Sequence, residues 1–425
     1  MLWRKLSKYI RYGRLVVRGL TPCELEIGKV PPDRPDLDVA IRIGDRATAW
    51  KLAVNPDLYF GEAYTAGELT IERGTLRALI EICLINLKRQ GNGARGWPAR
   101  LQRRVTATIR QRNGRKMAKS NVARHYDLSE DLYRRFLDDD RQYSCAYFSR
   151  PGMDLASAQA SKKALIAKKL LLRPGDRVLD IGCGWGGLAM TLGRLGAGDV
   201  TGITLSAEQL SVAAQRADKA GLSNTVHFAM QDYRDVRGSF DRIVSVGMFE
   251  HVGVPNYQVF FDTLARLLAK DGVAVLHSIG RMDGPGLTNS WIQRYIFPGG
   301  YAPALSEVIP AIERAGLWIT DIEVLRLHYA ETLVQWQQKF AEERAAVAGV
   351  YDEAFCRMWE FYLAASEMAF RHDGLMVFQI QLAKRIDAVP MTRDYLYSSD
   401  HVASSASKNL QSANVPEFEA ELAAD

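Results

Sequence analysis

The residues best suited to chemistry follow a short apolar run that is typical of a buried strand. Residues 177–181 read Arg-Val-Leu-Asp-Ile, and glycines stand at 182, 184, 186 and 187. Glycines after a strand let the backbone approach a ligand before a helix begins. A dinucleotide site has the wider spacing Gly-x-Gly-x-x-Gly, whereas Asp180, Gly182, Gly184 and Gly186 alternate. The pattern therefore favours S-adenosylmethionine over a dinucleotide, because the ammonium group of S-adenosylmethionine needs an anionic neighbour. It also favours a ligand site over a purely structural glycine-rich turn.

The next strand-like run ends in an unexpected residue. In comparable folds an Asp or Glu at this place binds the ribose hydroxyls of the ligand. Here the run ends at Thr204 and continues Leu-Ser-Ala-Glu-Gln209. The ribose position thus departs from the general methyltransferase pattern.

Strand-like and helix-like runs alternate from residue 154 onward and must position these groups. The expected helices cover residues 154–171, 188–195, 207–220 and 257–269. The expected strands cover residues 177–181, 199–204, 226–229, 240–246 and 272–278. Such alternation predicts an α/β fold with a doubly wound, mostly parallel, Rossmann-like sheet. Further helices are expected after residue 300, one of them rich in aromatic side chains.

The first part of the chain predicts a separate, smaller α/β domain over residues 1–115. Residues 2–20 fit a helix with apolar side chains on one side and basic ones on the other. That pattern is typical of a helix lying on a membrane surface, but equally of one packed on the protein's own core. Residues 91–118 resemble a linker, residues 116–397 form the expected catalytic domain, and residues 398–425 a disordered tail.

The modest net charge of +6 conceals two basic blocks on an acidic body. Residues 1–20 carry six Lys and Arg and no acid, and residues 82–126 carry twelve and no acid. Such blocks imply a polyanionic partner, either nucleic acid or an anionic membrane surface.

The cysteine count and the hydropathy bound the location. Five cysteines without a Cys-x-x-Cys pair argue against a disulfide framework or a zinc site, and no metal is expected. No apolar run approaches the ~20 residues of a membrane span, and no secretory signal is evident. The expected location is the cytoplasm, peripheral on the inner face of the membrane.

Several long motifs, in order, give the chain a family resemblance. It resembles the cyclopropane-fatty-acyl-phospholipid synthases and the related mycolic acid cyclopropane synthases over most of residues 120–390. The family uses the Thr and Gln of a T-L-S-x-x-Q segment in place of the usual acid, which accounts for Thr204 and Gln209. Residues 1–115 are similar to the extra N-terminal domain of the bacterial phospholipid enzymes. The motifs are His125-Tyr-Asp-Leu128, Tyr143-Ser-Cys-Ala-Tyr-Phe148, Leu179-Asp-Ile-Gly-Cys-Gly-Trp-Gly-Gly187, Gly202-Ile-Thr-Leu-Ser206, Gln231-Asp-Tyr-Arg-Asp235, Asp241–Gly253 and His277-Ser-Ile-Gly280.

The resemblance implies methyl transfer from S-adenosylmethionine to a cis double bond in an unsaturated phospholipid acyl chain. The resulting carbocation would lose a proton to a bound bicarbonate ion and close a cyclopropane ring. Positioning in a dry site would supply most of the catalysis, because the π bond is a weak nucleophile. The residues that the family uses around bicarbonate map to Cys145, Glu250, His277, Ile279 (through its backbone) and Tyr329.

The resemblance also assigns the donor contacts, to which the strand-end acid Asp180 is added. Aromatic faces at Tyr143, Trp185 and Phe249 are candidates for stabilising positive charge. Cys145 taken alone is more typical of a buried small side chain than of a nucleophile, and methyl transfer to an alkene needs no covalent enzyme intermediate. The full set of donor contacts is Tyr143, Ser144, Asp180, Gly182, Gly184, Gly186, Thr204, Gln209, Asp232 and Tyr233.

Three other functions remain to be weighed. A fatty-acyl C-methyltransferase that gives a methylene or methyl branch would share the motifs. A nucleic-acid methyltransferase would use the basic segment, but the sequence after the fourth strand is Gly247-Met-Phe-Glu-His251 rather than an Asn/Asp-Pro-Pro-Tyr/Phe motif, so no nucleic-acid partner is expected. The chain could also be a catalytically inactive lipid-binding protein, but the presence of Glu250, His277 and Tyr329 argues against this. Whether the chain forms a homodimer is left open.

Overall fold

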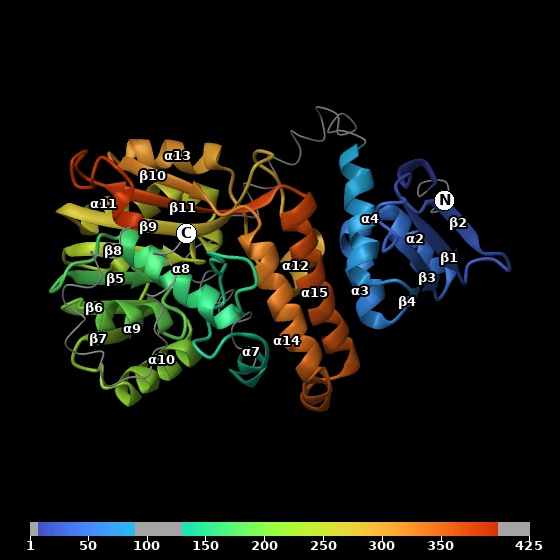
Figure 1. Ribbon diagram of the computed structural model, residues 1–425, viewed down its shortest axis with the longest axis horizontal. Helices are drawn as coiled ribbons and strands as arrows, with labels where there is room; N and C mark the ends of the chain where they lie inside the picture. Colours follow the sequence, from blue (N-terminus) through green and yellow to red (C-terminus); the bar gives the residue numbers. More distant parts are fainter. Residues whose placement is uncertain (1–6, 90–129, 398–425) are drawn as a thin grey trace, which may run out of the picture.

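The computed structural model describes residues 7–89 and 130–397. Figure 1 shows two sheets at opposite ends of the molecule with a group of helices between them. The predicted boundary near 115, most of the basic segment 82–126, the motif 125–128 and the tail 398–425 lie outside the described residues.

The N-terminal unit contains a four-stranded sheet in the order β2-β1-β3-β4. Strand β1 pairs antiparallel with β2 and parallel with β3, and β4 pairs antiparallel with β3. This arrangement confirms the predicted small α/β unit. Its elements are β1 (Gly13–Arg18), β2 (Leu25–Lys29), β3 (Asp38–Ile43), α2 (Arg46–Val54), α3 (Pro56–Ala66), β4 (Leu69–Arg73) and α4 (Leu76–Arg89).

The prediction of one helix over residues 2–20 is wrong, because residues 13–18 form the inner strand β1. Leu15, Val16 and Val17 are all buried, so apolar neighbours cover both faces of this strand. Two successive β-branched valines favour a strand, and pairing on both sides satisfies the backbone. Two of the basic side chains are also engaged, since Arg14 pairs with Glu26 and Arg18 with Glu72.

The larger unit contains a seven-stranded sheet in the order β10-β11-β9-β8-β5-β6-β7. Strands β9, β8, β5, β6 and β7 run parallel, and β11 lies antiparallel between β9 and β10. The mostly parallel sheet is confirmed, and the sequence had not indicated β10 or β11. The strands are β5 (Arg177–Ile181), β6 (Asp199–Thr204), β7 (Val226–Met230), β8 (Phe240–Val246), β9 (Leu268–Arg281), β10 (Trp318–Val324) and β11 (Leu375–Ala383).

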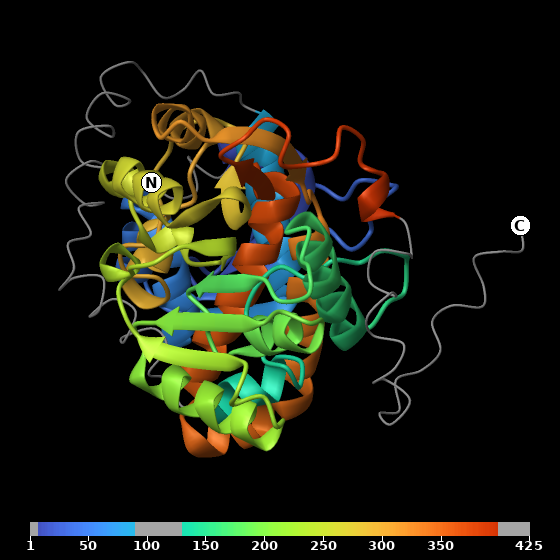
Figure 2. The same ribbon diagram turned by 90° about the vertical axis from the view of Figure 1, so that its left-hand side faces the viewer.

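Both faces of the parallel strands are buried, each under its own helices. Neighbouring residues alternate between two cores: Val178 packs with α8, α9 and α10, whereas Leu179 packs with α11 and α13. Figure 2 shows the stacked strands with helices on both sides. The covering helices are α8 (Leu155–Lys169), α9 (Gly187–Arg194), α10 (Ala207–Lys219), α11 (Tyr257–Leu267) and α13 (Leu305–Arg314).

Helices between the two sheets join the units. Helix α15 contacts α3, α4 and α14, and α12 contacts α3. The Arg77 guanidinium of α4 makes a bidentate ion pair with Glu367 of α15, whose carboxylate is fully buried. The remaining helices are α7 (Glu130–Phe136), α12 (Ser290–Tyr295), α14 (His328–Val350) and α15 (Glu353–His372).

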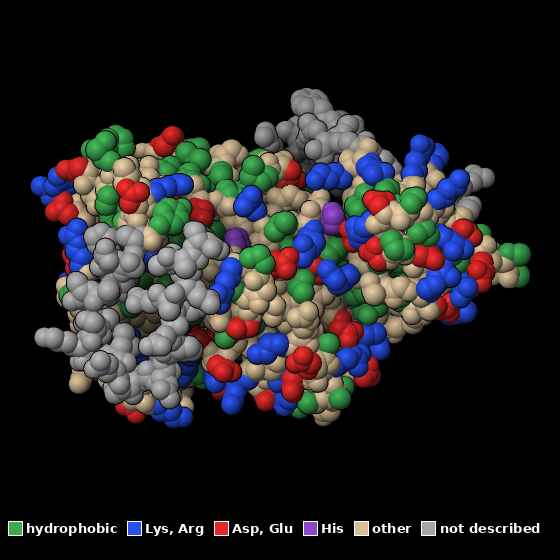
Figure 3. All heavy atoms as spheres, viewed as in Figure 1, with side chains coloured by type: hydrophobic (Ala, Val, Ile, Leu, Met, Phe, Trp, Pro, Cys, Tyr) green, Lys and Arg blue, Asp and Glu red, His purple; other side chains and the backbone are tan. Residues whose placement is uncertain are grey.

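The surface of the N-terminal unit carries both signs of charge. Figure 3 shows Lys and Arg side chains interspersed with Asp and Glu over this unit. Several of these side chains form ion pairs, including Arg34 with Glu81 and Arg42 with Glu72. Within residues 7–89 and 130–397, no helix has the length and apolarity that crossing a membrane requires.

Candidate functional site

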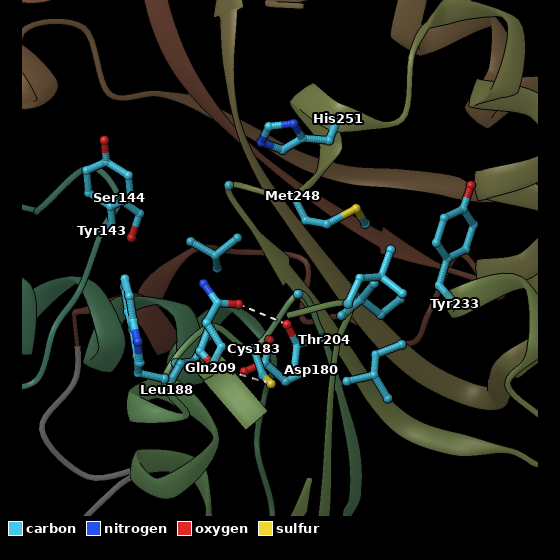
Figure 4. Close-up of a pocket in the computed structure, with 18 of the residues that line it drawn as sticks. Tyr143, Ser144, Asp180, Cys183, Leu188, Thr204, Gln209, Tyr233, Met248 and His251 are labelled. Atoms are coloured by element: carbon cyan, nitrogen blue, oxygen red, sulfur yellow. Dashed lines mark hydrogen bonds between the residues drawn. The ribbon is translucent and has the colours of Figure 1, made fainter. Parts of the chain in front are cut away.

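A pocket lies at the carboxyl ends of β5, β6 and β8, where ligands bind in open α/β sheets (Figure 4). Five segments line it, drawn from residues 141–144, 180–188, 203–209, 231–234 and 246–252. All the predicted donor contacts except Gly186 lie in its lining. The structure therefore brings these residues together around one pocket.

The glycines serve two purposes at this turn. Gly182, Gly184 and Gly186 all have positive φ, which favours glycine. A Cβ at Gly182 would come within 2.7 Å of the Met248 Cβ, whereas a Cβ at Gly184 would meet nothing within 4 Å. Gly186 caps α9 and packs closely against Phe228, so its role is to bring helix and sheet together rather than to line the pocket.

Asp180 is the buried acid of the pocket. Burial raises the pKa of its carboxyl to about 7, and the positive charge of Lys162 opposes that rise. Its Oδ2 accepts no hydrogen bond from the described residues. A buried carboxyl with an unsatisfied oxygen fits a ligand ammonium group.

Thr204 and Gln209 form one unit at the next strand end. The Thr204 hydroxyl donates to Gln209 Oε1 at 2.9 Å, as Figure 4 shows. Ser206 caps α10 by accepting from the Gln209 backbone N–H, which fixes the start of the helix. The pair therefore presents an amide and a hydroxyl where other folds present a carboxylate.

The loop after β7 holds its acid in an internal ion pair. Both Asp232 carboxylate oxygens accept from the Arg234 guanidinium, and both residues line the pocket. Tyr233 lines the same side and packs edge-on against Phe260. Gln231, Arg234 and Met248 also line the pocket; they lie within the motifs 231–235 and 241–253, but the sequence analysis did not name them as donor contacts.

Helix α8 holds the segment that carries Tyr143 and Ser144. The fully buried Lys162 ammonium donates to Gln142 Oε1 at 2.6 Å and to Ser144 Oγ at 2.8 Å. One turn earlier, the Gln159 amide donates to the backbone carbonyls of Gln142 and Ser144. These bonds fix the segment between the pocket and the interior, and the sequence argument missed both α8 residues.

Glu250 and Ile279 are brought into direct contact. The Ile279 backbone N–H donates to Glu250 Oε1 at 2.6 Å. Burial raises the pKa of the Glu250 carboxyl to about 7, and its Oε2 has no partner among the described residues. The Ile279 amide, predicted to contact bicarbonate, is thus already occupied by the predicted acid.

His277 is two residues before Ile279 on β9 and is also buried. Its Nδ1 lies 3.1 Å from Gln379 Nε2 on the adjacent strand β11. Burial, reinforced by the positive charges of Lys162 and Lys169, lowers the pKa of the imidazole to about 3. The ring is therefore neutral at physiological pH.

Cys145 and Tyr329 lie in one apolar core, against which Ile279 packs. The Cys145 thiol donates to the Ala146 carbonyl, and burial raises the pKa of the thiol well above its ordinary value. The Ala146 N–H donates to Thr332, one turn after Tyr329 on α14. A neutral, buried thiol is a poor nucleophile, which agrees with the structural interpretation of Cys145.

The three proposed aromatic residues differ in position. Tyr143 and Trp185 line the pocket, and both rings lie near that of Tyr133. Phe249 does not: it is fully buried and stacks on Tyr257 with the ring centroids 4.4 Å apart. Phe249 thus supports the turn before Glu250 instead of facing a ligand in the pocket.

Comparison with known proteins shows the family to which the chain is similar. The family model described as mycolic acid cyclopropane synthetase matches residues 113–380. The chain is 41% identical to the cyclopropane-fatty-acyl-phospholipid synthase of Escherichia coli K12 over 263 residues, covering 62% of this chain and 67% of that protein. It is 37% identical to the tuberculostearic acid methyltransferase of Mycobacterium tuberculosis over 350 residues, covering 76% and 78%.

A solved structure extends the likeness to the fold. Mycolic acid cyclopropane synthase CmaA1, solved in complex with SAH and CTAB, superposes with a TM-score of 0.59 at 34% identity. The likeness covers 62% of this chain and 97% of that one.

Proposed function

Because the chain belongs to the mycolic acid cyclopropane synthetase family, which transfers a methylene group from S-adenosylmethionine to lipid acyl chains, we propose a specific reaction. The enzyme converts the cis double bond of an unsaturated phospholipid acyl chain into a cyclopropane ring. The observation that carries the proposal is that Glu250 and His277 are buried beside the pocket: His251, next to Glu250, lines it, and the backbone N–H of Gly247 in its lining donates to the His277 carbonyl. Glu250, His277 and the buried Tyr329 make up the buried set.

The donor pocket meets the chemical needs of the methyl donor. When bound, S-adenosylmethionine supplies an electrophilic sulfonium methyl. Asp180 offers an ammonium group a carboxylate oxygen that no described residue satisfies, and the Thr204–Gln209 pair offers hydrogen bonds to ribose hydroxyls. The glycine turn lets the backbone approach at Gly184. These residues bind and orient, which is the main catalytic need when the nucleophile is a π bond.

The buried set is suited to hold a small anion such as bicarbonate. The Tyr329 hydroxyl and the neutral His277 ring can each donate to an oxyanion. Glu250 has a raised pKa and an Oε2 without a partner in residues 7–89 and 130–397, so it can accept a proton from such an anion or hold it by hydrogen bonding. The residues fit the ion, with one adjustment: the Ile279 amide holds Glu250 rather than the anion.

A second reaction is favoured by one specific relative. The tuberculostearic acid methyltransferase aligns over 350 residues, which is longer than the match to the Escherichia coli enzyme. A methylene branch, or a methyl branch beside a shifted double bond, would arise from the same cation if a different proton were lost, whereas a saturated methyl branch would also need a separate reductant. The cyclopropane and branched products are therefore the two outcomes to separate.

Product analysis separates them directly. The full chain is incubated with S-adenosylmethionine and vesicles of an unsaturated phospholipid, and the recovered acyl chains are examined by proton NMR. The expected result is high-field ring protons. Olefinic methylene signals without ring protons would assign the branched product instead, and an unchanged lipid would reject both reactions on phospholipid.

We also propose peripheral binding to an anionic membrane on the cytoplasmic side. The support is the twelve Lys and Arg among residues 82–126, each worth about 1 kcal/mol near an anionic surface. Residues 1–20 are a poor target for deletion, because their loss would remove β1 from the centre of its sheet.

Vesicle sedimentation tests this membrane proposal. A quadruple variant with glutamine at Arg103, Arg104, Arg110 and Arg112 is expected to bind anionic vesicles more weakly and with less dependence on salt. The matched control replaces four exposed basic residues of the catalytic unit, Arg173, Lys219, Arg237 and Lys270. Equal losses in both variants would contradict a specific role for the basic segment.

A further inference from the structure

The hydrogen bond at His277 Nδ1 belongs to a chain of buried polar groups. Lys169, at the end of α8, donates from its ammonium to Gln379 Oε1 at 2.7 Å, and Gln379 Nε2 lies 3.1 Å from His277 Nδ1. The Lys169 ammonium also contacts the Glu323 carboxylate on β10. All four groups lie on separate elements, α8, β9, β10 and β11.

The chemistry of these groups leaves one consistent assignment of protons. A lysine ammonium has three donors and no acceptor, so the amide atom of Gln379 that faces it must be the oxygen. The amide nitrogen then faces His277, and it can only donate. His277 Nδ1 must therefore be the acceptor, and the proton of the neutral ring must stand on Nε2.

We propose that Gln379, oriented by Lys169, fixes His277 as the Nε2–H tautomer, so that His277 acts as a hydrogen-bond donor and not as the base. The inference rests on the proposed function in that His277 belongs to the anion-binding set. It assigns Gln379 and Lys169 as positioning residues. Proton acceptance then falls to the bound anion or to Glu250, the acceptor whose Oε2 has no partner among the described residues.

The surrounding charges favour the same state. The cations acting on His277 are Lys162 and Lys169 of α8, and with burial they hold the pKa of the ring at about 3. The ring is 2% exposed, so water offers little competition for Nδ1. A neutral His277 ring can therefore donate a hydrogen bond to an oxyanion without transferring its proton to that oxyanion.

NMR of the full chain labelled with ¹⁵N in the histidine rings tests the tautomer without any substrate. The His277 signals are assigned by their loss in His277→Gln. The expected pattern is Nε2–H from pH 6 to 8, with no titration in that range. A pattern with the proton on Nδ1, or a titrating ring, would overturn the proposal.

Variants of Gln379 test whether the amide is the cause. In Gln379→Glu a carboxylate replaces the donor and should draw the proton to Nδ1, reversing the tautomer and raising the pKa of the ring. In Gln379→Leu both tautomers should appear. Turnover should fall about tenfold or more in both variants, whereas the dissociation constant for S-adenosylhomocysteine should change less than twofold.

The control is Gln381→Leu, a second buried glutamine on the same strand, whose amide bonds to Lys169 O and Tyr395 instead. It should destabilise the protein as Gln379→Leu does, yet leave the tautomer unchanged. A tautomer unmoved in both Gln379 variants would reject the inference. Failure to form a lipid product while the tautomer behaves as expected would instead reject the proposed function alone.

Discussion

Asp180 in the donor pocket and Glu250 in the buried set carry the same perturbation in different surroundings. Burial raises the pKa of each carboxyl to about 7, and each has one oxygen without a partner among the described residues. Lys162 acts on Asp180, whereas Glu250 accepts a backbone N–H from Ile279. Two carboxyl groups with the same pKa can therefore have different roles. A ligand cation beside Asp180 would hold that carboxyl in its ionised form, whereas Glu250 would remain able to take up and release a proton.

The largest expected effect separates chemistry from donor binding at Glu250. Glu250→Gln keeps an acceptor for the Ile279 N–H but cannot take a proton. Turnover should fall by about 10²–10⁴-fold, the usual contribution of a general acid or base. The dissociation constant for S-adenosylhomocysteine, measured by calorimetry, should stay within twofold. Retention of full turnover would remove Glu250 from the mechanism.

A smaller effect is expected from Lys162→Met, which removes a buried support of the segment that lines the donor pocket. The change leaves the Gln142 and Ser144 side chains without their buried donor, which costs about 1–3 kcal/mol for each unsatisfied group. S-adenosylhomocysteine should bind about tenfold more weakly. Lys168→Met is the control and should bind S-adenosylhomocysteine normally, because among the described residues the Lys168 ammonium bonds only to the Leu396 carbonyl. Equal affinities in the two variants would contradict the role given to α8.

The pH dependence of donor binding tests Asp180. Because its pKa is raised in the folded protein, the neutral carboxyl is favoured at low pH, and ligand affinity should rise with pH up to about 7. The increase can reach about tenfold per pH unit below that value. The same shift means that Asp180 contributes stability below pH 4 and loses it as pH rises through 7. In Asp180→Asn the pH dependence of affinity should flatten. If the affinity of the wild-type protein did not change between pH 5 and 8, Asp180 would not contact the ligand ammonium group.

The smallest effect is expected at Tyr143, which borders both regions. It lines the donor pocket, and its hydroxyl shares a 2.7 Å hydrogen bond with the Tyr362 hydroxyl. Tyr143→Phe keeps the ring but removes that bond, at a cost of about 1–3 kcal/mol in the free energy of unfolding. Turnover and donor affinity should each change only a few-fold. A loss as large as that of Glu250→Gln would give the hydroxyl a direct role.

The sequence predicted the parallel part of the larger sheet to within a few residues. Runs such as 177–181 are buried on both faces and bounded by turns, so their pattern depends little on distant residues. Strand β1 was mistaken for a helix because its basic side chains coincide with a helical period. Their actual partners, Glu26 and Glu72, are on other strands. Strand β11 was missed because its partners β9 and β10 are distant in the sequence.

The donor pocket was more predictable than its supports. The glycine turn, Thr204 and Gln209 are encoded in short segments, and the structure brings them together. Glu250 and Ile279 were both named, but their mutual hydrogen bond was not foreseen. Lys162, Lys169 and Gln379 were missed because burial, the property that marks them, arises only from tertiary packing. A lysine on the buried side of a helix is the sequence signal that could have found the first two.

Helix α8 contributes both buried lysines, seven positions apart. Seven residues are about two turns and ~10 Å, so Lys162 and Lys169 stand on one side of the helix. Lys162 bonds to the segment that lines the pocket, and Lys169 bonds to Gln379, whose amide lies beside His277. The length of the helix between the two lysines thus sets the distance between the two groups that they support. Inserting one residue between the lysines would rotate one of them by about 100° relative to the other. We therefore expect chimaeras between relatives to remain active when surface residues of this helix are exchanged, but to lose activity when the number of residues between the two lysines changes.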